Sequence, residues 1–502
     1  MAVGHNKEEG ESFSLQFGFV AGRGVSSLMR ATKIVATLGP STDSEAVVRK
    51  LFESGVDVFR LNASHGTQED HAKRIDWVRT LSAEFKVHAG IMLDLQGPKI
   101  RLGTFQNGSC FLAEKAVFTI TTESIEGNGE IASTTYPDFA RDVKTGDPVL
   151  IADGTVQLRV LDTNGVQARC EVVTGGQVSD RKGINLPGVN ISTPSLSKKD
   201  IADAHFGVER GVDFFALSFV RQARDVLRLR HLLEEVDAKM PIIAKIEKPE
   251  GWQNLDAILE ECDGVMVARG DLGVEMAIER VPAIQKAMIE KARTCGRFVI
   301  TATQMLESMI ENAMPTRAEV SDVANAIYDG TSAIMLSAET SAGRYPVEAV
   351  KVMARIAAET EHSLHQKGFA SGRTREDLEI PEIIADAAFH CARSAGVKAL
   401  AVGTTSGASA RLLAQYRPPV PIFAFTTHEP VARQLSIVYG VHPILAPAMD
   451  STDGMLHQME RLLIETGRVQ PGDKIVFVAG QPVGMRGTTN MLKLHKVSGI
   501  RS

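Results

Sequence analysis

Eight short apolar runs recur along the chain, and each is followed by a stretch with a helical pattern. Near-continuous runs of valine, isoleucine, leucine and methionine between helices are typical of parallel strands that are buried on both faces. Eight such units predict an α/β fold with a closed (β/α)8 barrel of the TIM type. The runs begin at Thr32, Val56, Ala89, Val212, Pro241, Asp263, Arg297 and Thr331.

Polar residues gather where these apolar runs end. In such barrels the carboxyl ends of the strands form the rim that carries the chemistry, and strands that were merely buried would show no bias toward one end. The polar residues at these ends are Thr37, Arg60, Asn62, Ser64, Asp94, Ser218, Lys245, Glu247, Asp271, Thr303, Ser337 and Glu339.

Lys245, Glu247 and Asp271 are the most informative of these residues. Lys245 and Glu247 end the run PIIAKIE, and Asp271 ends the next run, DGVMVARGD, before a loop. Two carboxylates offer the hard oxygen ligands that Mg²⁺ prefers, and an ammonium can neutralise a phosphoryl group in transfer. An ion pair that closes the rim is the alternative. The shared position on the rim favours the metal and phosphate site.

An inserted domain interrupts the barrel pattern between the third and fourth runs. Residues 100–194 contain short strand-like pieces separated by turn signals, which predicts a β-barrel domain on a βα loop, placed as a lid over the rim. The barrel then comprises 31–99 and 195–366. An N-terminal arm comprises 1–30, and a smaller α/β domain follows a polar linker and comprises 380–502.

Composition narrows the class of protein. The 502 residues suggest roughly three domains. The net charge of −6 and the lack of a basic stretch argue against a nucleic-acid partner. Five scattered cysteines without a CxxC pair argue for a reducing compartment and against structural zinc. No apolar run reaches about eighteen residues, and the start is acidic, so we expect neither a membrane span nor a signal peptide, and a cytoplasmic protein.

The segment FRLNASHG carries candidates for phosphate binding. Alternation along a strand places Arg60, Asn62 and Ser64 on one face, where a guanidinium, an amide and a hydroxyl suit a polyphosphate. His65 follows in the same segment and either joins these phosphate-binding candidates or is simply the first residue of a helix.

Three basic residues point toward the expected lid. In LDLQGPKIR, the Gly97–Pro98 turn directs Lys99 and Arg101 out of the barrel, either as anion ligands or as a solvated hinge pair. Lys182, in RKGINLPG, lies where the lid returns, and either reaches a nucleotide phosphate on closure or is a plain surface lysine.

Two hydroxyl-rich segments are further candidates. Thr303, in TATQMLESM, could donate to a substrate carboxylate at the start of a helix. In the last domain, GTTSGASA follows a strand and opens a helix, so its hydroxyls and amide groups form either a phosphate nest or a helix N-cap.

Together these segments resemble the pyruvate kinase family from about Thr32 to the C-terminus. The family transfers a phosphoryl group from phosphoenolpyruvate to ADP and then protonates the enolate to give pyruvate and ATP. The resemblance implies a TIM barrel with a β lid and a C-terminal regulatory domain, Mg²⁺ or Mn²⁺ as the metal, and a homotetramer. The motifs are TLGPST, RLNASHG, LDLQGPKIR, KGINLPG, IIAKIEKPEG, VARGDLGVE, TATQMLESM, PTRAEVSDVANA and MLSAETSAGRYP.

The resemblance also implies roles for individual residues. Glu247 and Asp271 would hold Mg²⁺, Lys245 would neutralise the phosphoryl group, and Arg60 would contact the phosphate. The substrate carboxylate would meet Thr303 and the backbone of Ala268, Arg269 and Gly270. Thr303 and Ser337 would lie near the route of the proton. The nucleotide would face Thr37, Pro40, Asn62, His65, Arg101 and Lys182. An effector would meet Thr404, Thr405, Ser406, Gly407, Ser409 and Thr488.

One departure from the common family pattern concerns K⁺. Many members carry a glutamate at the position of Lys99 and require K⁺, which Asn62, Ser64 and Asp94 would help to bind. Lys99 matches the potassium-independent, bacterial type of the family, in which the ammonium occupies the place of the cation. The resemblance therefore implies activity without K⁺.

Two other departures concern nucleotide and effector. Asp70 stands where many relatives have an aromatic residue near adenine. The 479–490 loop lacks an arginine-proline-glycine-serine run, and its Gly487–Asn490 segment is similar to bacterial enzymes that respond to sugar monophosphates or AMP.

Two rival hypotheses remain open at this point. A Mg²⁺-dependent barrel lyase that cleaves oxo-acids would also use rim carboxylates, but it would not need the lid or Lys182. A non-catalytic metabolite sensor would be expected to lack Lys245, Glu247 or Asp271, and all three are present.

Overall fold

The computed structural model describes residues 30–189, 191–367, 378–394, 396–448, 451–482 and 489–498, and it leaves out the side chains of 365–367. All but the last residue of the expected arm lies outside this range. That residue, Arg30, is tied to the barrel, because its guanidinium donates to the Gly55 carbonyl oxygen at 2.8 Å and pairs with Asp57.

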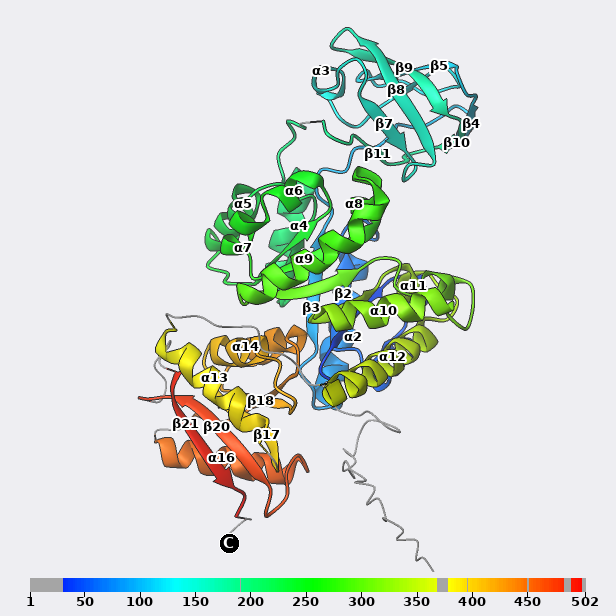
Figure 1. The fold of residues 1–502 in the computed structure, drawn as a ribbon. Coiled ribbons are helices and arrows are strands. Elements are labelled where there is room, and N and C mark those ends of the chain that lie inside the picture. The colour runs from blue at the N-terminus through cyan, green and yellow to red at the C-terminus, as the bar shows by residue number, and fades with distance from the viewer. Residues whose placement is uncertain are drawn as a thin grey trace, which may run out of the picture.

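The eight apolar runs form the closed parallel barrel that the sequence predicts (Figure 1). Every residue of these strands is buried except Asn62 at the end of β2, which is why the runs are almost continuously apolar. In their order around the barrel the strands are β1 (Lys33–Leu38), β16 (Ala333–Leu336), β15 (Phe298–Ala302), β14 (Gly264–Ala268), β13 (Ile242–Ile246), β12 (Phe214–Leu217), β3 (Gly90–Leu95) and β2 (Val58–Asn62).

Helices between the strands cover the outside of the barrel. Several begin with reciprocal capping boxes: before α4, Ser197 Oγ accepts from the Asp200 amide at 3.1 Å and Asp200 accepts from the Ser197 amide at 2.8 Å. The helices are α1 (Glu45–Ser54), α2 (Gln68–Glu84), α4 (Lys198–Glu209), α5 (Ala223–Glu234), α6 (Pro249–Gln253), α7 (Leu255–Glu261), α8 (Arg269–Glu275), α9 (Val281–Thr294), α10 (Arg317–Asp329), α11 (Ala338–Ser341) and α12 (Pro346–Lys367).

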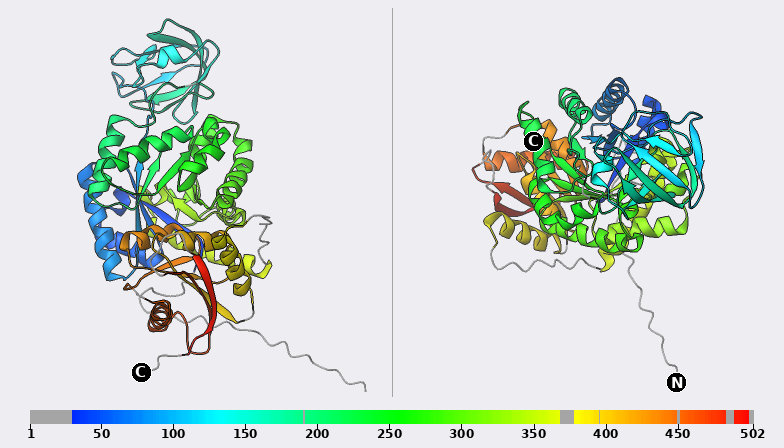
Figure 2. Two further views of the ribbon diagram at one scale, coloured as in Figure 1. Left: turned by 90° about the vertical axis from the view of Figure 1, so that its left-hand side faces the viewer. Right: turned by 90° about the horizontal axis from the view of Figure 1, so that it is seen from above.

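The inserted segment is a β domain at one end of the barrel (Figures 1 and 2). Its strands form a six-stranded, half-barrel sheet, β11-β7-β8-β9-β5-β6, and a two-stranded sheet, β10-β4, which agrees with the expected β-barrel lid. The elements are β4 (Ser109–Leu112), β5 (Val117–Thr121), β6 (Ile131–Ser133), α3 (Phe139–Asp142), β7 (Pro148–Ile151), β8 (Val156–Thr163), β9 (Gln167–Thr174), β10 (Gly176–Ser179) and β11 (Ile184–Asn185).

The C-terminal domain is a five-stranded sheet in the order β19-β18-β17-β20-β21. The sequence predicted its four parallel strands but not β21 (Thr489–Lys496), an antiparallel edge strand whose side chains are mostly exposed and polar. The other elements are α13 (Ile380–Ala392), β17 (Val397–Gly403), α14 (Ala408–Gln415), β18 (Ile422–Thr426), α15 (Glu429–Gln434), β19 (Val441–Leu445), α16 (Thr452–Glu465) and β20 (Lys474–Gly480).

The C-terminal domain docks on the amino ends of the barrel strands. Lys33, at the start of β1, donates to the Val441 carbonyl oxygen at 2.7 Å, and Arg433 pairs with Asp213, just before β12, at 2.7 Å. The lid lies at the opposite end, so the carboxyl rim faces the lid (Figure 2). Across the described part of the chain, none of the helices is both long and apolar enough to cross a membrane.

Candidate active site

Lys245 lies at the centre of the carboxyl rim and is only 8% exposed. Its ammonium donates to Ser218 Oγ at 2.6 Å and pairs with Glu247 Oε1 at 2.9 Å and Asp94 Oδ1 at 3.2 Å. Lys245 and Glu247 are two residues apart at the end of β13, so alternation along the strand places them on the same side. The ammonium thus has three acceptors from three neighbouring strand ends.

Arg60 joins this cluster from β2. Its guanidinium donates from Nε to Asp94 Oδ2 at 2.7 Å and from Nη1 to Thr37 Oγ1 at 3.0 Å. The sequence placed Arg60 and Thr37 at the rim, and the structure adds that a single carboxylate, Asp94, lies between two cations, Arg60 and Lys245. Asp94 is 1% exposed, so it balances these charges almost without water.

Burial and neighbouring charges set the pKa values of the cluster. Burial alone would lower the pKa of Lys245, but Asp94 and Glu247 outweigh it and raise this pKa. Burial alone would raise the pKa of Asp94, but Lys245 and Arg60 outweigh it and hold this pKa below its ordinary value. Burial raises the pKa of Glu247, and Asp271 adds to that rise against the effect of Lys245. The ammonium of Lys245 is therefore charged at neutral pH.

Glu247 and Asp271 fit a magnesium ion. The charge of Asp271 acts on the pKa of Glu247, and Glu247 Oε2 accepts from the Phe219 amide at 2.7 Å. No group of three or more metal-ligating His, Cys, Asp or Glu residues exists in the described ranges. Mg²⁺ does not require one, because it binds through one or two carboxylates and takes its other ligands from substrate and water.

Asp271 does not lie where the sequence suggested. β14 ends at Ala268, and Asp271 lies in the first turn of α8 rather than at a strand end before a loop. The apolar run and the first turn of the helix are continuous in sequence, so no local signal separates them. The carboxylate still reaches the rim, because α8 begins directly at the end of the strand.

A hydrogen bond joins Thr303 to the first turn of α8. Thr303 Oγ1 accepts from the Gly270 amide at 2.8 Å and donates to the Ala302 carbonyl oxygen at 2.6 Å. The side chain of Arg269 turns away to Asp322 at 2.7 Å, so this residue and Ala268 can offer only backbone to a substrate. Thr303 has φ 67°, a left-handed conformation that costs energy for a threonine and is typical of functional sites.

Ser337 lies just past β16. Its amide donates to Glu339 Oε2 at 2.7 Å, and the other Glu339 carboxylate oxygen accepts from the Leu306 amide at 3.1 Å. Glu339 is fully buried and thereby connects the segments that follow β15 and β16.

The residues predicted to face a nucleotide lie along the rim and on the lid. Asn62 ends β2 and accepts from the Ser64 amide at 3.1 Å, and Pro40 is exposed at the start of a short 3-10 helix, Pro40–Thr42. Arg101 and Lys182 belong to the lid, and Lys182 is exposed. Burial lowers the pKa of His65, and the charges of Arg101, Lys99 and Arg60 lower it further. The charges of three basic side chains thus act on His65.

Comparison with known proteins identifies the family. A family model described as the barrel domain of pyruvate kinase matches residues 29–350, and a second, described as its alpha/beta domain, matches 382–495. The chain belongs to the pyruvate kinase family.

Individual members of this family are similar to the chain over most of its length. The pyruvate kinase of Staphylococcus epidermidis is 44% identical over 472 residues, 93% of this chain and 81% of the relative. That of Geobacillus stearothermophilus is 45% identical over 477 residues, 94% and 81% of the two chains. A crystal structure of a pyruvate kinase from Cryptosporidium parvum superposes with a TM-score of 0.86 at 36% identity, covering 93% of this chain and 96% of that one.

The pyruvate kinase assignment settles the reaction class. The reaction is phosphoryl transfer from phosphoenolpyruvate to ADP, which gives pyruvate and ATP in the last step of glycolysis. The lyase hypothesis is thereby set aside. The family generally uses Mg²⁺, which agrees with the two carboxylates at the rim.

Lys99 is not joined to the site expected for a monovalent cation. Within the described residues, no hydrogen bond or ion pair connects Lys99 to Asp94, Asn62 or Ser64. Its Cε lies beside Gly183 of the lid, 3.5 Å from where a Cβ on that glycine would be. Lys99 thus lies at the junction of barrel and lid, and the carboxylate of Asp94 is occupied by Lys245 and Arg60.

Several contacts in the site escaped the sequence reasoning. Ser218 and the Phe219 amide orient Lys245 and Glu247, and their only signal is the position just after a strand. Asp70 closes a capping box: Thr67 Oγ1 accepts from the Asp70 amide at 3.2 Å, and Asp70 accepts from the Thr67 amide at 2.9 Å. The buried pair Lys248–Glu275, at 3.1 Å, gave no local signal, because its partners are far apart in sequence.

The expected effector residues lie around the start of α14. Gly407, with φ 82°, is the N-cap residue, and its amide donates to Thr404 Oγ1 at 2.9 Å. Ser409 Oγ lies 2.6 Å from Thr489 Oγ1, which joins this loop to β21. Thr405 and Ser406 are half-buried in the same loop, and Thr488 lies outside the described residues. Because the N-cap residue is a glycine, none of the loop hydroxyls caps α14 with its side chain, and phosphate binding remains a hypothesis.

The position of Asp94 between two cations predicts a large cost for its neutralisation. We expect Asp94→Asn to lower the free energy of unfolding by about 3–5 kcal/mol at neutral pH, because it leaves Arg60 buried without its countercharge and Lys245 with Glu247 as its remaining one. Urea unfolding followed by circular dichroism measures the change. Asp256→Asn is the matched control, since Asp256 pairs with Lys291 on the surface with its side chain 76% exposed, where about 0–1 kcal/mol is expected. Equal effects of the two substitutions would contradict the proposed charge balance.

Proposed function

We propose that Lys245, Arg60, Glu247 and Asp271 perform Mg²⁺-dependent phosphoryl transfer in this chain. The observation that carries the proposal is the ammonium of Lys245, held at 2.9 Å from a carboxylate that shares its surroundings with Asp271. The phosphoryl group in transfer carries its charge on three equatorial oxygens, and cations fixed in advance stabilise it without reorganisation. Mg²⁺, when bound, adds Lewis-acid neutralisation of phosphoryl oxygens.

The roles of the two cations follow from their partners. Lys245 exchanges one of its three acceptors for a phosphoryl oxygen, while the other two keep the ammonium in place. Arg60 keeps Asp94 through Nε, and its Nη1 would exchange Thr37 Oγ1 for a phosphate oxygen. Asp94 therefore acts by orientation and not by contact with the substrate.

The substrate carboxylate would lie at the start of α8. The backbone of Ala268, Arg269 and Gly270 faces it, and Thr303 Oγ1 exchanges the Ala302 carbonyl oxygen for a carboxylate oxygen. Thr303 and Ser337 flank the route by which a proton reaches the enolate, with a water chain as the alternative donor.

The nucleotide would bind between rim and lid. Arg101 and Lys182 come from the lid side and Asn62 and His65 from the rim, with Thr37 and Pro40 nearby. Closure of the lid would bring the two sets together around the phosphates and exclude water from the transfer.

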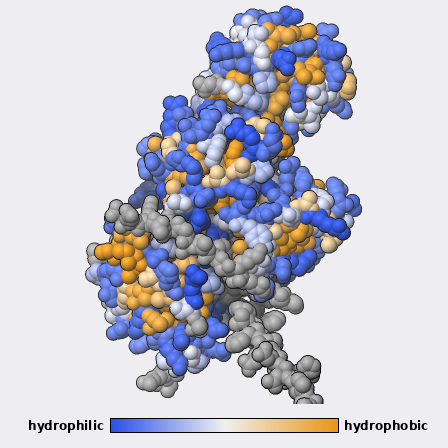
Figure 3. Space-filling model, viewed as in Figure 1, coloured by the Kyte–Doolittle hydropathy of each residue, from blue (hydrophilic) through white to orange (hydrophobic). Residues whose placement is uncertain are grey.

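The chain is further proposed to act as a homotetramer in the cytoplasm, with an effector site at the start of α14. An apolar surface over α13, visible in Figure 3, supports association: Ile380 is 62% and Ile383 51% exposed, and Leu494 on the neighbouring edge strand β21 is 55% exposed. Sedimentation velocity should give the mass of four chains.

Thermal-shift measurements should reveal stabilisation by a sugar monophosphate or AMP, and no shift with any of them would count against the effector site.

Removal of the ammonium tests the catalytic assignment. We expect Lys245→Met to reduce kcat by about 10²–10³-fold or more, because it removes one preorganised charge, worth about 3–4 kcal/mol. A coupled assay of pyruvate formation measures the loss. Lys291→Met, at a half-exposed lysine on α9, should keep normal turnover. Normal turnover by Lys245→Met would remove Lys245 from the mechanism.

Lys99 predicts activity without K⁺. We propose that its ammonium supplies the charge that K⁺ supplies in members with a glutamate at this position. Activity with Mg²⁺ alone should therefore be near maximal, and Lys99→Glu should make turnover dependent on K⁺. Steady-state rates with KCl or tetramethylammonium chloride at equal ionic strength provide the measurement. A large K⁺ requirement of the unaltered chain would refute the proposal.

A further inference from the structure

A buried contact of three side chains links the lid to both segments that carry the proposed metal ligands. Glu275 Oε1, at the end of α8, accepts from Lys248 Nζ at 3.1 Å and from Asn185 Nδ2 at 2.9 Å. Glu275 is 4% and Lys248 6% exposed. Asn185 belongs to β11 of the lid, whereas the other two residues belong to the barrel.

The ion pair runs beside the proposed metal site. Lys248 directly follows Glu247, and Glu275 lies one helical turn after Asp271, on the same face of α8. Lys248 and Glu275 therefore connect the same two segments that Glu247 and Asp271 would connect through a metal ion. The ion pair can hold these segments at a fixed separation before any metal arrives.

The carboxylate of Glu275 has hydrogen-bond donors at only one of its two oxygens. Its Oε2 is buried and has no hydrogen-bond partner in the described structure. An ionised carboxylate in such surroundings depends strongly on the donors that remain, so losing Asn185 or Lys248 should displace it. Since α8 has only seven residues, a displacement at Glu275 also moves Asp271 and the Gly270 amide.

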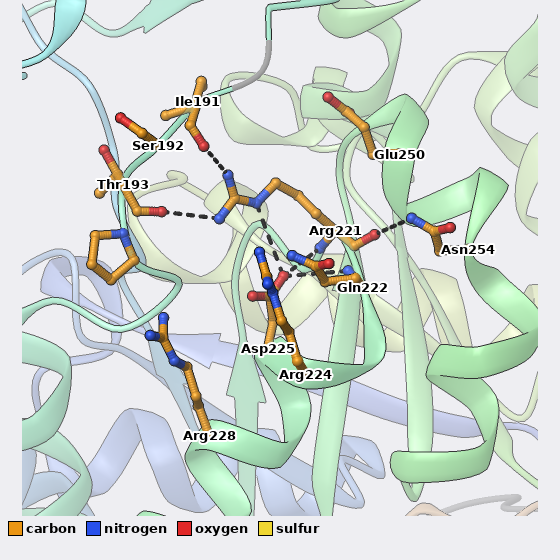
Figure 4. Close-up of a pocket in the computed structure, with 11 residues that line it drawn as sticks. Ile191, Ser192, Thr193, Arg221, Gln222, Arg224, Asp225, Arg228, Glu250 and Asn254 are labelled. Carbon is orange, nitrogen blue, oxygen red and sulfur yellow. Dashed lines mark hydrogen bonds and ion pairs between the residues drawn. The ribbon is translucent and has the colours of Figure 1, made fainter. Parts of the chain in front are cut away.

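The lid is attached to the barrel at a second point. Arg221 donates to the carbonyl oxygens of Ile191 at 2.5 Å and Thr193 at 2.9 Å, where the lid returns to the barrel (Figure 4). A cavity of about 500 Å³, lined both by the returning chain and by the barrel, borders this clamp. Rotation of the lid about Arg221 would change the Asn185–Glu275 contact and leave the clamp intact.

We propose that Glu275 is a positioning residue that, paired with Lys248, holds the segments of Glu247 and Asp271 at the separation a divalent cation needs, and that Asn185 makes this separation depend on the lid. Glu275 does not contact the substrate. The inference rests on the proposed function, because it takes Glu247 and Asp271 as the metal ligands.

Direct binding of Mn²⁺ to the full chain without substrates tests the inference. Electron paramagnetic resonance of free Mn²⁺ gives the Kd. Glu275→Gln should weaken binding by about 10–100-fold, the usual effect of losing a residue that orients metal ligands. Glu279→Gln, four residues further along and exposed, is the matched control and should bind as the unaltered chain does.

A double-mutant cycle tests the role of the lid. Asn185→Ala, which leaves the buried ion pair intact, should weaken Mn²⁺ binding severalfold, and it should have no further effect when combined with Glu275→Gln. Gln106→Ala, at an exposed lid residue, should change nothing. If circular dichroism shows that Glu275→Gln does not fold, Mn²⁺ binding by Asn185→Ala alone tests the inference.

The outcomes separate this inference from the proposed function. If Glu247→Gln abolishes Mn²⁺ binding while folded Glu275→Gln or Asn185→Ala binds as the unaltered chain does, the positioning role is wrong and the metal site stands. If Glu247→Gln itself binds Mn²⁺ normally, the ligand assignment is wrong, and the positioning role is lost with it.

Discussion

The catalytic rim depends on the balance between Asp94 and the two cations that flank it. Lys245 and Arg60 both lie where water is scarce, and a buried cation is stable only when it is paired and hydrogen-bonded. Asp94 supplies both needs from a third strand. The same contact that makes these cations tolerable in the fold also orients them, so that a phosphoryl group meets charge already in place. Under the proposed function, stability and catalysis are thus coupled through one carboxylate.

Of the two other domains, only the lid faces this rim. The C-terminal domain occupies the amino ends of the strands, and the lid is inserted on a loop at the carboxyl ends, as in the barrels whose chemistry sits at that face. Three contacts join the lid to the barrel: Lys99 lies beside Gly183, Asn185 bonds Glu275, and Arg221 bonds the returning chain. Movement of the lid therefore acts on the site through few, identifiable bonds.

Much of this fold could be predicted from the chain itself. The eight apolar runs gave the barrel, because strands buried on both faces leave a continuous signal, and the polar ends gave the rim. The edge strand β21 was missed because an exposed strand carries little apolar signal. The lid was expected as a β domain, but the order of its strands was not, because strand-like segments do not reveal which of them pair. Asp271 was placed on a strand, since the run passes without a break into α8.

What the sequence determined by itself is the chemistry available: which carboxylates, ammonium and guanidinium groups follow which strands, and hence a metal and phosphate site on a (β/α)8 rim. Only the tertiary structure decided which charged side chains pair with each other. It assigned Asp94 to Lys245 and Arg60, left Lys99 at the lid, and joined Lys248 to Glu275 and Asn185. The reason is physical: strand and helix periodicity is a local property, whereas the partner of a buried charge is set by closure of the barrel, which brings together residues far apart in sequence.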